Sequence, residues 1–290
     1  MNRNNIILAL KSLNGLRVGD CIGQAVIKKK ISNITDLEAL ENGSLPYTDD
    51  SEQAKILYDH VLKNNDVVPD ELVTELYEGY NNSNIKEEYG GRTKKYFNDI
   101  LNNNLVYPAN SFGNGCLMRI VPSICYFYKN KKILEKLLGT CVYTHNNIES
   151  FEAVTLLVTF VSDLIWGYKE IKDYFGIQNT IIKDHYLPRS LKLINSEVIK
   201  KEINKIIDNE LFIDIKDVVK LVGNGRLATV FDTLPFCLWV IMRNINDYKG
   251  AIKECMVSGG DIDTNCAIVG AAVSIFDDVP KLFIDKCKKI

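Results

Sequence analysis

Apolar residues recur at every third or fourth position along most of this sequence, and this periodicity limits the possible folds more than any other feature. Long examples are IILALKSLNGLRVGDCIGQAV (6–26), FEAVTLLVTFVSDLIWGY (151–168) and NCAIVGAAVSIF (265–276), and the spacing is that of one face of an α-helix. Several segments are apolar nearly all round, which is typical of central helices enclosed by others. No alternating β-branched run bounded by hairpin turns appears. We therefore predict an all-α fold, a compact orthogonal bundle of many helices.

The length and composition are sufficient for one large domain. The chain has 290 residues, of which 46% are hydrophobic and 25% are charged, so it can bury a core of its own. The breaks between the helical segments are short and rich in glycine or asparagine, and neither a linker nor an internal repeat separates them. We predict a single domain over residues 1–290, and we expect a monomer.

Charge and cysteine usage narrow the cellular setting. The net charge of −2 gives no long-range attraction to nucleic acid or to an anionic membrane, so neither is an expected partner. The N-terminal segment contains Lys11 and Arg17 and lacks a small-residue cleavage site, so we predict no signal peptide. No apolar run is long enough to span a membrane. The eight cysteines never occur in CxxC spacing, which favours small core residues of a cytoplasmic protein over a disulfide or zinc framework.

The stretch PYTDDSEQA (46–54) holds more oxygen-bearing side chains than the start of a helix requires. Asp50 or Ser51 could cap the helix that follows, and Gln53 could complete a capping box three residues after Asp50. That leaves Thr48 and Asp49 unexplained. They belong either to an ordinary solvated loop or to a set of oxygen ligands.

A second acidic cluster stands near the other end of the chain, in SGGDIDTNCAIVGAA (258–272). Asp263 or Thr264 is the expected N-cap of the apolar helix, and the two glycines before it allow a tight turn. An EF-hand is excluded. Counting Asp261 as its first position puts Cys266 where the glycine belongs and Ala272 where the bidentate glutamate belongs.

If the two acidic clusters meet, they need a cation. Asp49, Asp50, Asp261 and Asp263 together carry about four negative charges, while two helix N-termini supply only roughly +0.5 each. One or two divalent cations could balance this charge. A set of oxygen ligands without histidine or cysteine selects Mg²⁺ or Mn²⁺ over zinc. Helix caps alone remain the alternative.

Six motifs in this order resemble those of the ADP-ribosylglycohydrolase family, which includes the dinitrogenase reductase-activating glycohydrolase and the ADP-ribosyl-arginine and ADP-ribosyl-serine hydrolases. They are GLRVGDCIGQA (15–25), YTDDSEQA (47–54), FGNGCLMRIVP (112–122), THNNIESFEA (144–153), ATVFDTLPFCLWV (228–240) and GGDIDTNCAIVGAA (259–272). The resemblance covers most of the chain, and its most specific parts are the paired TDD and GGDxDT motifs with GNG between them.

The resemblance implies a binuclear Mg²⁺ or Mn²⁺ centre at the base of an ADP-ribose cleft. It also implies hydrolysis of the bond between ribose C1″ and a modified side chain, with an arginine linkage favoured, so the expected partners are ADP-ribose and an ADP-ribosylated protein. Asp49, Asp50 and Asp261 are the expected catalytic residues. The metal ligands, carried over by motif, are Thr48, Asp49, Asp50, Asp261, Asp263 and Thr264.

The NSFGNG stretch fits an ADP-ribose pocket in the same resemblance. Gly113 and Gly115 would let backbone N–H groups approach the pyrophosphate. Ser111 and Asn114 offer hydrogen bonds to ribose or phosphate, and Phe112 could stack on a base. The alternative is an ordinary Asn-Gly turn.

Five further residues are assigned with their alternatives. His145 is expected at the cleft edge, contacting ribose or phosphate, although a histidine after a helix is often structural. Gly225 and Arg226 are expected in a second pocket-lining loop, for which an ordinary Asn-Gly turn is again the alternative. Arg119 could pair with phosphate or form an internal ion pair, and Asp20 is expected to fix the adjacent loop rather than to bind metal.

The sequence departs from the family pattern at one place. Many members carry a glutamate shortly after the GDxxG motif, where it helps to activate water, and Ile27 stands there in this chain. A missing general base costs about 10²–10⁴ in rate. Asp36, Glu38, Glu41 or one of the paired aspartates could replace it. The alternative function is therefore a catalytically weak ADP-ribose-binding protein with an immunity, sensing or structural role.

Overall fold

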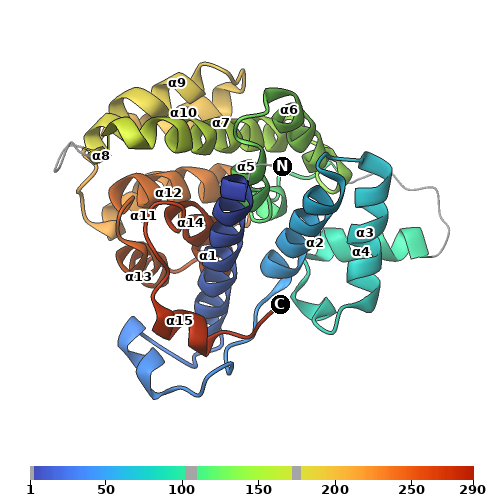
Figure 1. Cartoon of the computed structure of the whole chain (residues 1–290). Helices are drawn as coiled ribbons and strands as arrows, with labels where there is room; N and C mark the ends of the chain where they lie inside the picture. The colour runs from blue at the N-terminus through green and yellow to red at the C-terminus, as the bar shows by residue number, and fades with distance from the viewer. Residues whose placement is uncertain (1–2, 102–109, 172–177) are drawn as a thin grey trace.

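The computed structural model describes residues 3–101, 110–171 and 178–290, and within these ranges the chain is helical and contains no β-strand (Figure 1). Short η segments connect some helices: 3₁₀ turns η1 (Ile34–Ala39), η2 (Lys86–Glu88), η3 (Asn114–Cys116) and η4 (Thr140–Tyr143), and a π-helical turn η5 (Ile182–Tyr186). The α-helices are α1 (Arg3–Ile27), α2 (Asp49–Asn64), α3 (Pro69–Asn82), α4 (Gly91–Leu101), α5 (Val121–Phe127), α6 (Lys131–Gly139), α7 (Ile148–Ile171), α8 (Gln178–Ile181), α9 (Leu187–Leu191), α10 (Glu197–Ile207), α11 (Ile215–Val222), α12 (Val230–Arg243), α13 (Tyr248–Ser258), α14 (Ile262–Val273) and α15 (Lys281–Lys286). The predicted all-α fold is confirmed.

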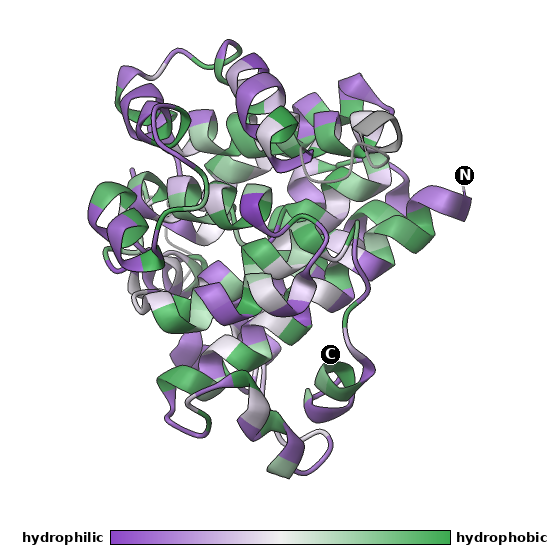
Figure 2. Ribbon diagram, turned by 90° about the vertical axis from the view of Figure 1, so that its left-hand side faces the viewer, coloured by the Kyte–Doolittle hydropathy of each residue, from purple (hydrophilic) through white to green (hydrophobic). Residues whose placement is uncertain are grey.

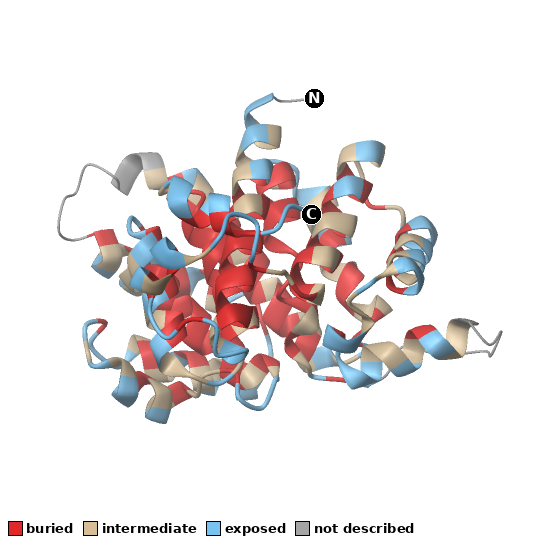
Figure 3. Cartoon of the chain, turned by 90° about the horizontal axis from the view of Figure 1, so that it is seen from below, coloured by how far each residue is buried: buried red, intermediate tan, exposed pale blue. Residues whose placement is uncertain are grey.

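Helices α1 and α14 lie at the centre of the bundle, and the other helices surround them (Figure 1). Apart from Asp263, every residue of α14 is buried, and so is nearly all of α1 from Ser12 to Ala25. Buried residues accordingly concentrate in the central helices in Figure 3. The outer helices carry hydrophilic residues beside hydrophobic ones (Figure 2), as expected when one face of a helix meets solvent. The segments that are apolar all round are thus the central ones.

Three glycines bring the backbones of α1 and α14 into contact. Gly15, Gly19 and Gly23 are spaced by four residues and share one face of α1. A Cβ atom at Gly19 would lie 2.0 Å from the carbonyl oxygen of Cys266, and one at Gly23 would lie 2.5 Å from the Cα of Asp263. The two helices run antiparallel, because the partner number falls as the α1 number rises. The contact places the end of α1 beside the start of α14.

The cysteines and the helix lengths bear on two further expectations. All eight cysteines are buried and unpaired, as predicted for small core residues. None of the described helices has the length and hydropathy needed to cross a bilayer.

We expect Gly19→Ala to destabilise the fold by about 1–3 kcal/mol, because the added methyl overpacks the contact with α14. Gly139→Ala is the matched control, since a Cβ there meets nothing within 4 Å and the glycine has a helical φ of −60°. The control should be neutral or slightly stabilising. Urea unfolding of both variants measures the difference, and equal stabilities would contradict the proposed contact.

Candidate functional site

A pocket of about 420 Å³ opens where the starts of α2 and α14 meet the η2 segment and the loops before η3 and α12. Its volume is within the range of small-molecule binding sites. The lining residues are Asp49, Asp50, Gln53, Glu88, Gly90, Gly91, Arg92, Thr93, Ser111, Phe112, Gly113, Asn114, Gly115, Met118, His145, Leu227, Ala228, Thr229, Asp261, Asp263 and Thr264.

Helix α2 begins in a network centred on Asp20 of α1. Thr48 is the N-cap, and its hydroxyl accepts the N–H of Asp50 at 3.3 Å; the predicted caps, Asp50 and Ser51, are therefore wrong. The buried Asp20 carboxylate accepts the N–H of Thr48 at 2.9 Å, the N–H of Ser51 at 3.2 Å and both hydroxyls of these residues. Asp20 thus fixes the loop, which agrees with its predicted role.

Helix α14 begins one residue after Asp261, which is its N-cap. Asp263 and Thr264 therefore lie in the first turn, and the prediction that one of them is the cap is wrong. The Thr264 hydroxyl lies 3.4 Å from Asp50 Oδ2 and joins the two helix starts. Asn114 Nδ2 donates to Asp261 Oδ2 at 2.7 Å. The two acidic clusters, far apart in sequence, thus meet in one place.

Burial and the charges of neighbouring carboxylates raise the pKa of these carboxyl groups. Removal from water, the largest effect, raises the pKa of Asp20 and of Asp261 to about 7. It raises the pKa of Asp49 and Asp50 well above the ordinary value, and the charges of Asp20 and Asp263 raise both further. The cluster by itself therefore favours protonated carboxyl groups, and a cation would reverse that preference.

One oxygen of this cluster has no hydrogen-bond partner among the described residues. Asp50 Oδ1 is buried and unpaired, while Oδ2 lies 2.9 Å from the Thr48 hydroxyl. An unpaired buried acceptor costs about 1–3 kcal/mol, and a cation would remove that cost. Carboxylate and hydroxyl oxygens are the ligands that Mg²⁺ and Mn²⁺ prefer. The residues present therefore fit the predicted ions.

The two glycines of the GNG motif pack against His145. A Cβ at Gly113 would lie 3.1 Å from His145 Nε2, and one at Gly115 would lie 2.9 Å from Cε1. Thr144 Oγ1 accepts from Arg119 Nη2 at 2.8 Å and lies 2.8 Å from His145 Nδ1. The hydroxyl has a second lone pair, so it either donates to Nδ1 or accepts from an Nδ1–H group, and the first arrangement places the proton of the neutral ring on Nε2. Burial, aided by the charge of Arg119, lowers the pKa of His145 to about 3, so the ring in the pocket is neutral.

Arg119 neither lines the pocket nor forms an ion pair among the described residues. Its buried guanidinium donates to Gln53 Oε1 at 2.7 Å and to the carbonyl of Thr140 at 3.1 Å. Gln53 in turn donates to Asp49 Oδ2 at 2.9 Å. Both predicted roles of Arg119 are replaced by a third, in which it holds the side chain that orients Asp49.

Three predicted residues do not line the pocket. Thr48 is buried behind Asp50 and contacts it. Gly225 lies against the other acidic helix start, where a Cβ would be 2.9 Å from the Cβ of Asp261. Arg226 is exposed. The substrate contacts expected of Gly225 and Arg226 stay predictions. Their loop does line the pocket, but through the next three residues, 227–229.

Sequence reasoning missed the residues that η2 and the start of α4 bring to the pocket. Glu88 and Arg92 both line it, and Arg92 Nη1 donates to Ser111 Oγ at 3.2 Å. The sequence around them, KEEYGGR, carries no motif that would have singled them out. Only the packing of the chain shows their place.

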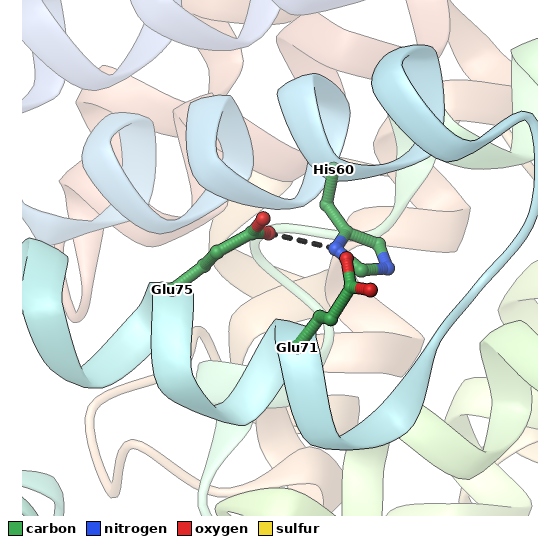
Figure 4. Close-up of side chains that lie close together, drawn as sticks. All are labelled: His60, Glu71 and Glu75. Carbon is green, nitrogen blue, oxygen red and sulfur yellow. Dashed lines mark hydrogen bonds and ion pairs between the residues drawn. The ribbon is translucent and has the colours of Figure 1, made fainter.

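A separate cluster of possible metal ligands, His60, Glu71 and Glu75, joins α2 to α3 (Figure 4). The N–H of Val68 donates to His60 Nε2 at 3.0 Å, so the ring proton is on Nδ1, which donates to Glu75 Oε2 at 2.7 Å. Lys63 Nζ lies 3.2 Å from Glu75 Oε1 and 3.5 Å from Glu71 Oε2. Because the ring has no free lone pair and a cation is already present, this cluster is a structural link between helices.

The model of the family described as ADP-ribosylglycohydrolase matches residues 5–288. The chain belongs to the ADP-ribosylglycohydrolase family. Members are hydrolases that act on ADP-ribosylated substrates, and membership supports this enzymatic activity here.

Two relatives and one solved structure agree with this family. The L543 protein of Acanthamoeba polyphaga mimivirus is 24% identical and the match covers 98% of this chain and 92% of the relative. ADP-ribosylhydrolase ARH3 of Xenopus tropicalis is 23% identical, with 91% and 85% covered. The solved structure named ADP-ribosylglycohydrolase-related protein complex has a TM-score of 0.67 at 17% identity, over 99% of this chain and 94% of its own, and shows the same fold.

We expect the metal-free ADP-ribosylglycohydrolase to lose stability as the pH rises from 5 to 8. The folded-state pKa of Asp20 and of Asp261 is about 7, against about 3.9 for an unfolded aspartate. Between these values the native state binds more protons, so the free energy of unfolding falls as the pH rises. Melting curves in EDTA, and with Mg²⁺ or Mn²⁺, measure this. The cations should raise Tm more at pH 8 than at pH 5.

Asp50→Asn should abolish the rise in Tm with Mg²⁺ or Mn²⁺, because it removes the carboxylate that reaches both helix starts. In EDTA at pH 8 it should be at least as stable as the unmodified protein, since one buried carboxyl fewer has to ionise. Glu75→Gln is the control, and it should keep the cation-dependent rise. The reverse pattern in the two variants would place the ion at the His60 cluster instead.

Proposed function

We propose that this protein is a metal-dependent hydrolase that cleaves the bond between ADP-ribose C1″ and a modified protein side chain, releasing ADP-ribose. We further propose that two Mg²⁺ or Mn²⁺ ions bind where α2 and α14 begin. The observation that carries the proposal is the buried, unpaired Asp50 Oδ1 in a pocket wall that also contains Asp49, Asp261 and Asp263. A site of this kind is built for hard cations.

Three of the proposed ligands are oriented by hydrogen bonds with neighbouring side chains. Asp20 orients Thr48, Gln53 orients Asp49, and Asn114 orients Asp261. When bound, the ions would act as Lewis acids that polarise the reacting water and stabilise charge that develops at the anomeric centre. The proposed ligand set is Thr48, Asp49, Asp50, Asp261, Asp263 and Thr264.

Groups on the other wall of the pocket suit the nucleotide. Phe112 is partly exposed, and its ring lies 5.6 Å from that of Phe231, so adenine could extend the aromatic pair. Arg92 offers a cation to the diphosphate. Ser111 Oγ and Nε2 of neutral His145 add hydrogen bonds to phosphate or ribose. These contacts would place ribose C1″ toward the carboxylates.

An arginine linkage is favoured because the pocket is acidic. Asp49 and Asp263 are partly exposed in its wall, and an acidic wall attracts a cationic guanidinium more than a neutral serine O-glycoside. Glu88, a carboxylate of the same pocket, lies outside the proposed ligand set and remains to attract the guanidinium after the ions bind.

A second candidate function is a catalytically weak ADP-ribose-binding protein. The observation that favours it is Ile27, the last residue of α1, which is 42% exposed and supplies no carboxylate where many relatives have one. Binding would be retained in such a protein, because the residues that hold the nucleotide and the ions do not depend on position 27.

We expect the purified protein to release ADP-ribose from an ADP-ribosyl-arginine peptide in Mg²⁺ or Mn²⁺ and not in EDTA, and more slowly from an ADP-ribosyl-serine peptide. Asp261→Asn should lower kcat at least about 10²-fold, as expected when a group that stabilises the transition state is lost. Asp278→Asn, whose carboxylate is exposed beside Lys11, is the control and should have no effect.

Chromatography of released ADP-ribose measures the rates, and calorimetry with free ADP-ribose measures binding. Cation-dependent binding without release from either peptide would establish the second candidate function in place of the first.

A further inference from the structure

Glu88 is a carboxylate of the pocket that belongs to neither acidic helix start. It ends η2, and its side chain, 32% exposed, lines the same pocket as Asp49, Asp50 and Asp263. The pocket thus receives a carboxylate from a third direction. Nothing in the sequence motifs explains its presence.

Two residues of α1 hold this carboxylate. Gln24 Nε2 donates to Glu88 Oε2 at 2.9 Å, and Lys28 Nζ lies 3.4 Å from Oε1. Gln24 is buried and follows Gly23, whose backbone packs against Asp263. The hydrogen bond therefore ties Glu88 to the part of α1 that touches the start of α14.

The η2 segment itself is anchored. The next residue, Tyr89, is buried, its ring lies 5.1 Å from that of Tyr80, and its hydroxyl donates to Glu52 Oε2 at 2.6 Å. Because Glu52 is in the first turn of α2, Glu88 is held at a fixed distance from Asp49 and Asp50. A carboxylate that is both anchored and partly open to the pocket is suited to act on a substrate.

Asp20 and the three acids proposed from the sequence do not supply such a carboxylate. Asp20 is fully buried and accepts hydrogen bonds from the loop before α2. Asp36 accepts the backbone N–H groups of Ser32 and Asn33 in a capping box. Neither Asp36 nor the other two acids proposed from the sequence, Glu38 and Glu41, lines the pocket.

We propose that Glu88, positioned by Gln24, is the general base of the reaction, in the role for which α1 lacks an acid at Ile27. Residues 20, 24 and 27 share one face of α1, so an acid at position 27 and an acid held by Gln24 approach the pocket from the same side. The inference rests on the proposed hydrolase function.

The step balances as follows. The oxygen of a water molecule forms a bond to ribose C1″, and the bond from C1″ to the side-chain heteroatom breaks with its electron pair on the leaving group. Glu88 accepts the proton that the water loses, and the leaving group takes up a proton from solvent. Glu88 then returns its proton to solvent.

Glu88→Gln tests the proposal, with Glu87→Gln as the matched control. Glu87 is the preceding residue of η2, its side chain is 98% exposed, and it does not line the pocket. Glu88→Gln should lower kcat about 10²–10⁴-fold. It should leave KM and the calorimetric Kd of ADP-ribose with Mg²⁺ within about threefold, and Tm within a few degrees, of the values of the unmodified protein. Glu87→Gln should match the unmodified protein in every measurement.

Two rescues separate a base from a structural residue. Formate should restore part of the rate of Glu88→Ala, because a small carboxylate can enter the space that the side chain leaves. Ile27→Glu should restore part of the rate of Glu88→Gln, since it supplies an acid from the same side of the pocket.

The outcomes are distinct. If the unmodified protein is active and Glu88→Gln keeps its rate, Glu88 is not the base and the hydrolase function stands. If Glu88→Gln also loses ADP-ribose binding or melts much lower, and neither rescue works, Glu88 is structural. If the unmodified protein releases ADP-ribose from no substrate, the proposed function fails and this proposal fails with it.

Discussion

The backbones of α1 and α14 touch at Gly19 and Gly23, and the site depends on that contact. It places the start of α14 beside the end of α1, so that Asp20 supports the loop before α2 while Asp263 stands against Gly23. Any side chain at these glycines would separate the helices by the width of a methyl group or more. The two carboxylate-bearing helix starts, separated by more than two hundred residues, would then no longer meet in one pocket.

The buried carboxyl groups at the helix starts lower the stability of the fold, although the proposed site requires them. Buried carboxyl groups with raised pKa values weaken the metal-free fold at neutral pH, and hydrogen bonds from Asn114 and Gln53 offset only part of the cost. A fold tolerates such a cluster when its large apolar core supplies the remaining stability. The central position of α1 and α14 in that core is therefore as important to the site as the acids themselves.

The sequence predicts the helical fold and most of the pocket, because periodicity and the TDD, GNG and GGDIDT motifs are local patterns. Prediction from the sequence fails where contacts between residues far apart in the chain determine the local structure. Thr48 and Asp261 are the N-caps of α2 and α14, and each is held by a residue far away in the sequence, Thr48 by Asp20 and Asp261 by Asn114. Glu88 is held at the pocket by its hydrogen bond from Gln24 and by the anchoring of its neighbour Tyr89, and both contacts are tertiary. The four-residue spacing of the glycines at 15, 19 and 23 is a local pattern as well, and it predicts a close contact between α1 and another helix.

His145 and the two glycines of GNG make a constraint of another kind. A Cβ at position 113 or 115 would lie about 3 Å from the imidazole ring, so the ring favours glycine at both positions by shape, whatever the backbone N–H groups bind. Positions 113, 115 and 145 are consequently coupled by shape. A small residue at position 145 would leave room for a methyl group at 113 or 115, whereas with histidine there either methyl group requires the ring to move.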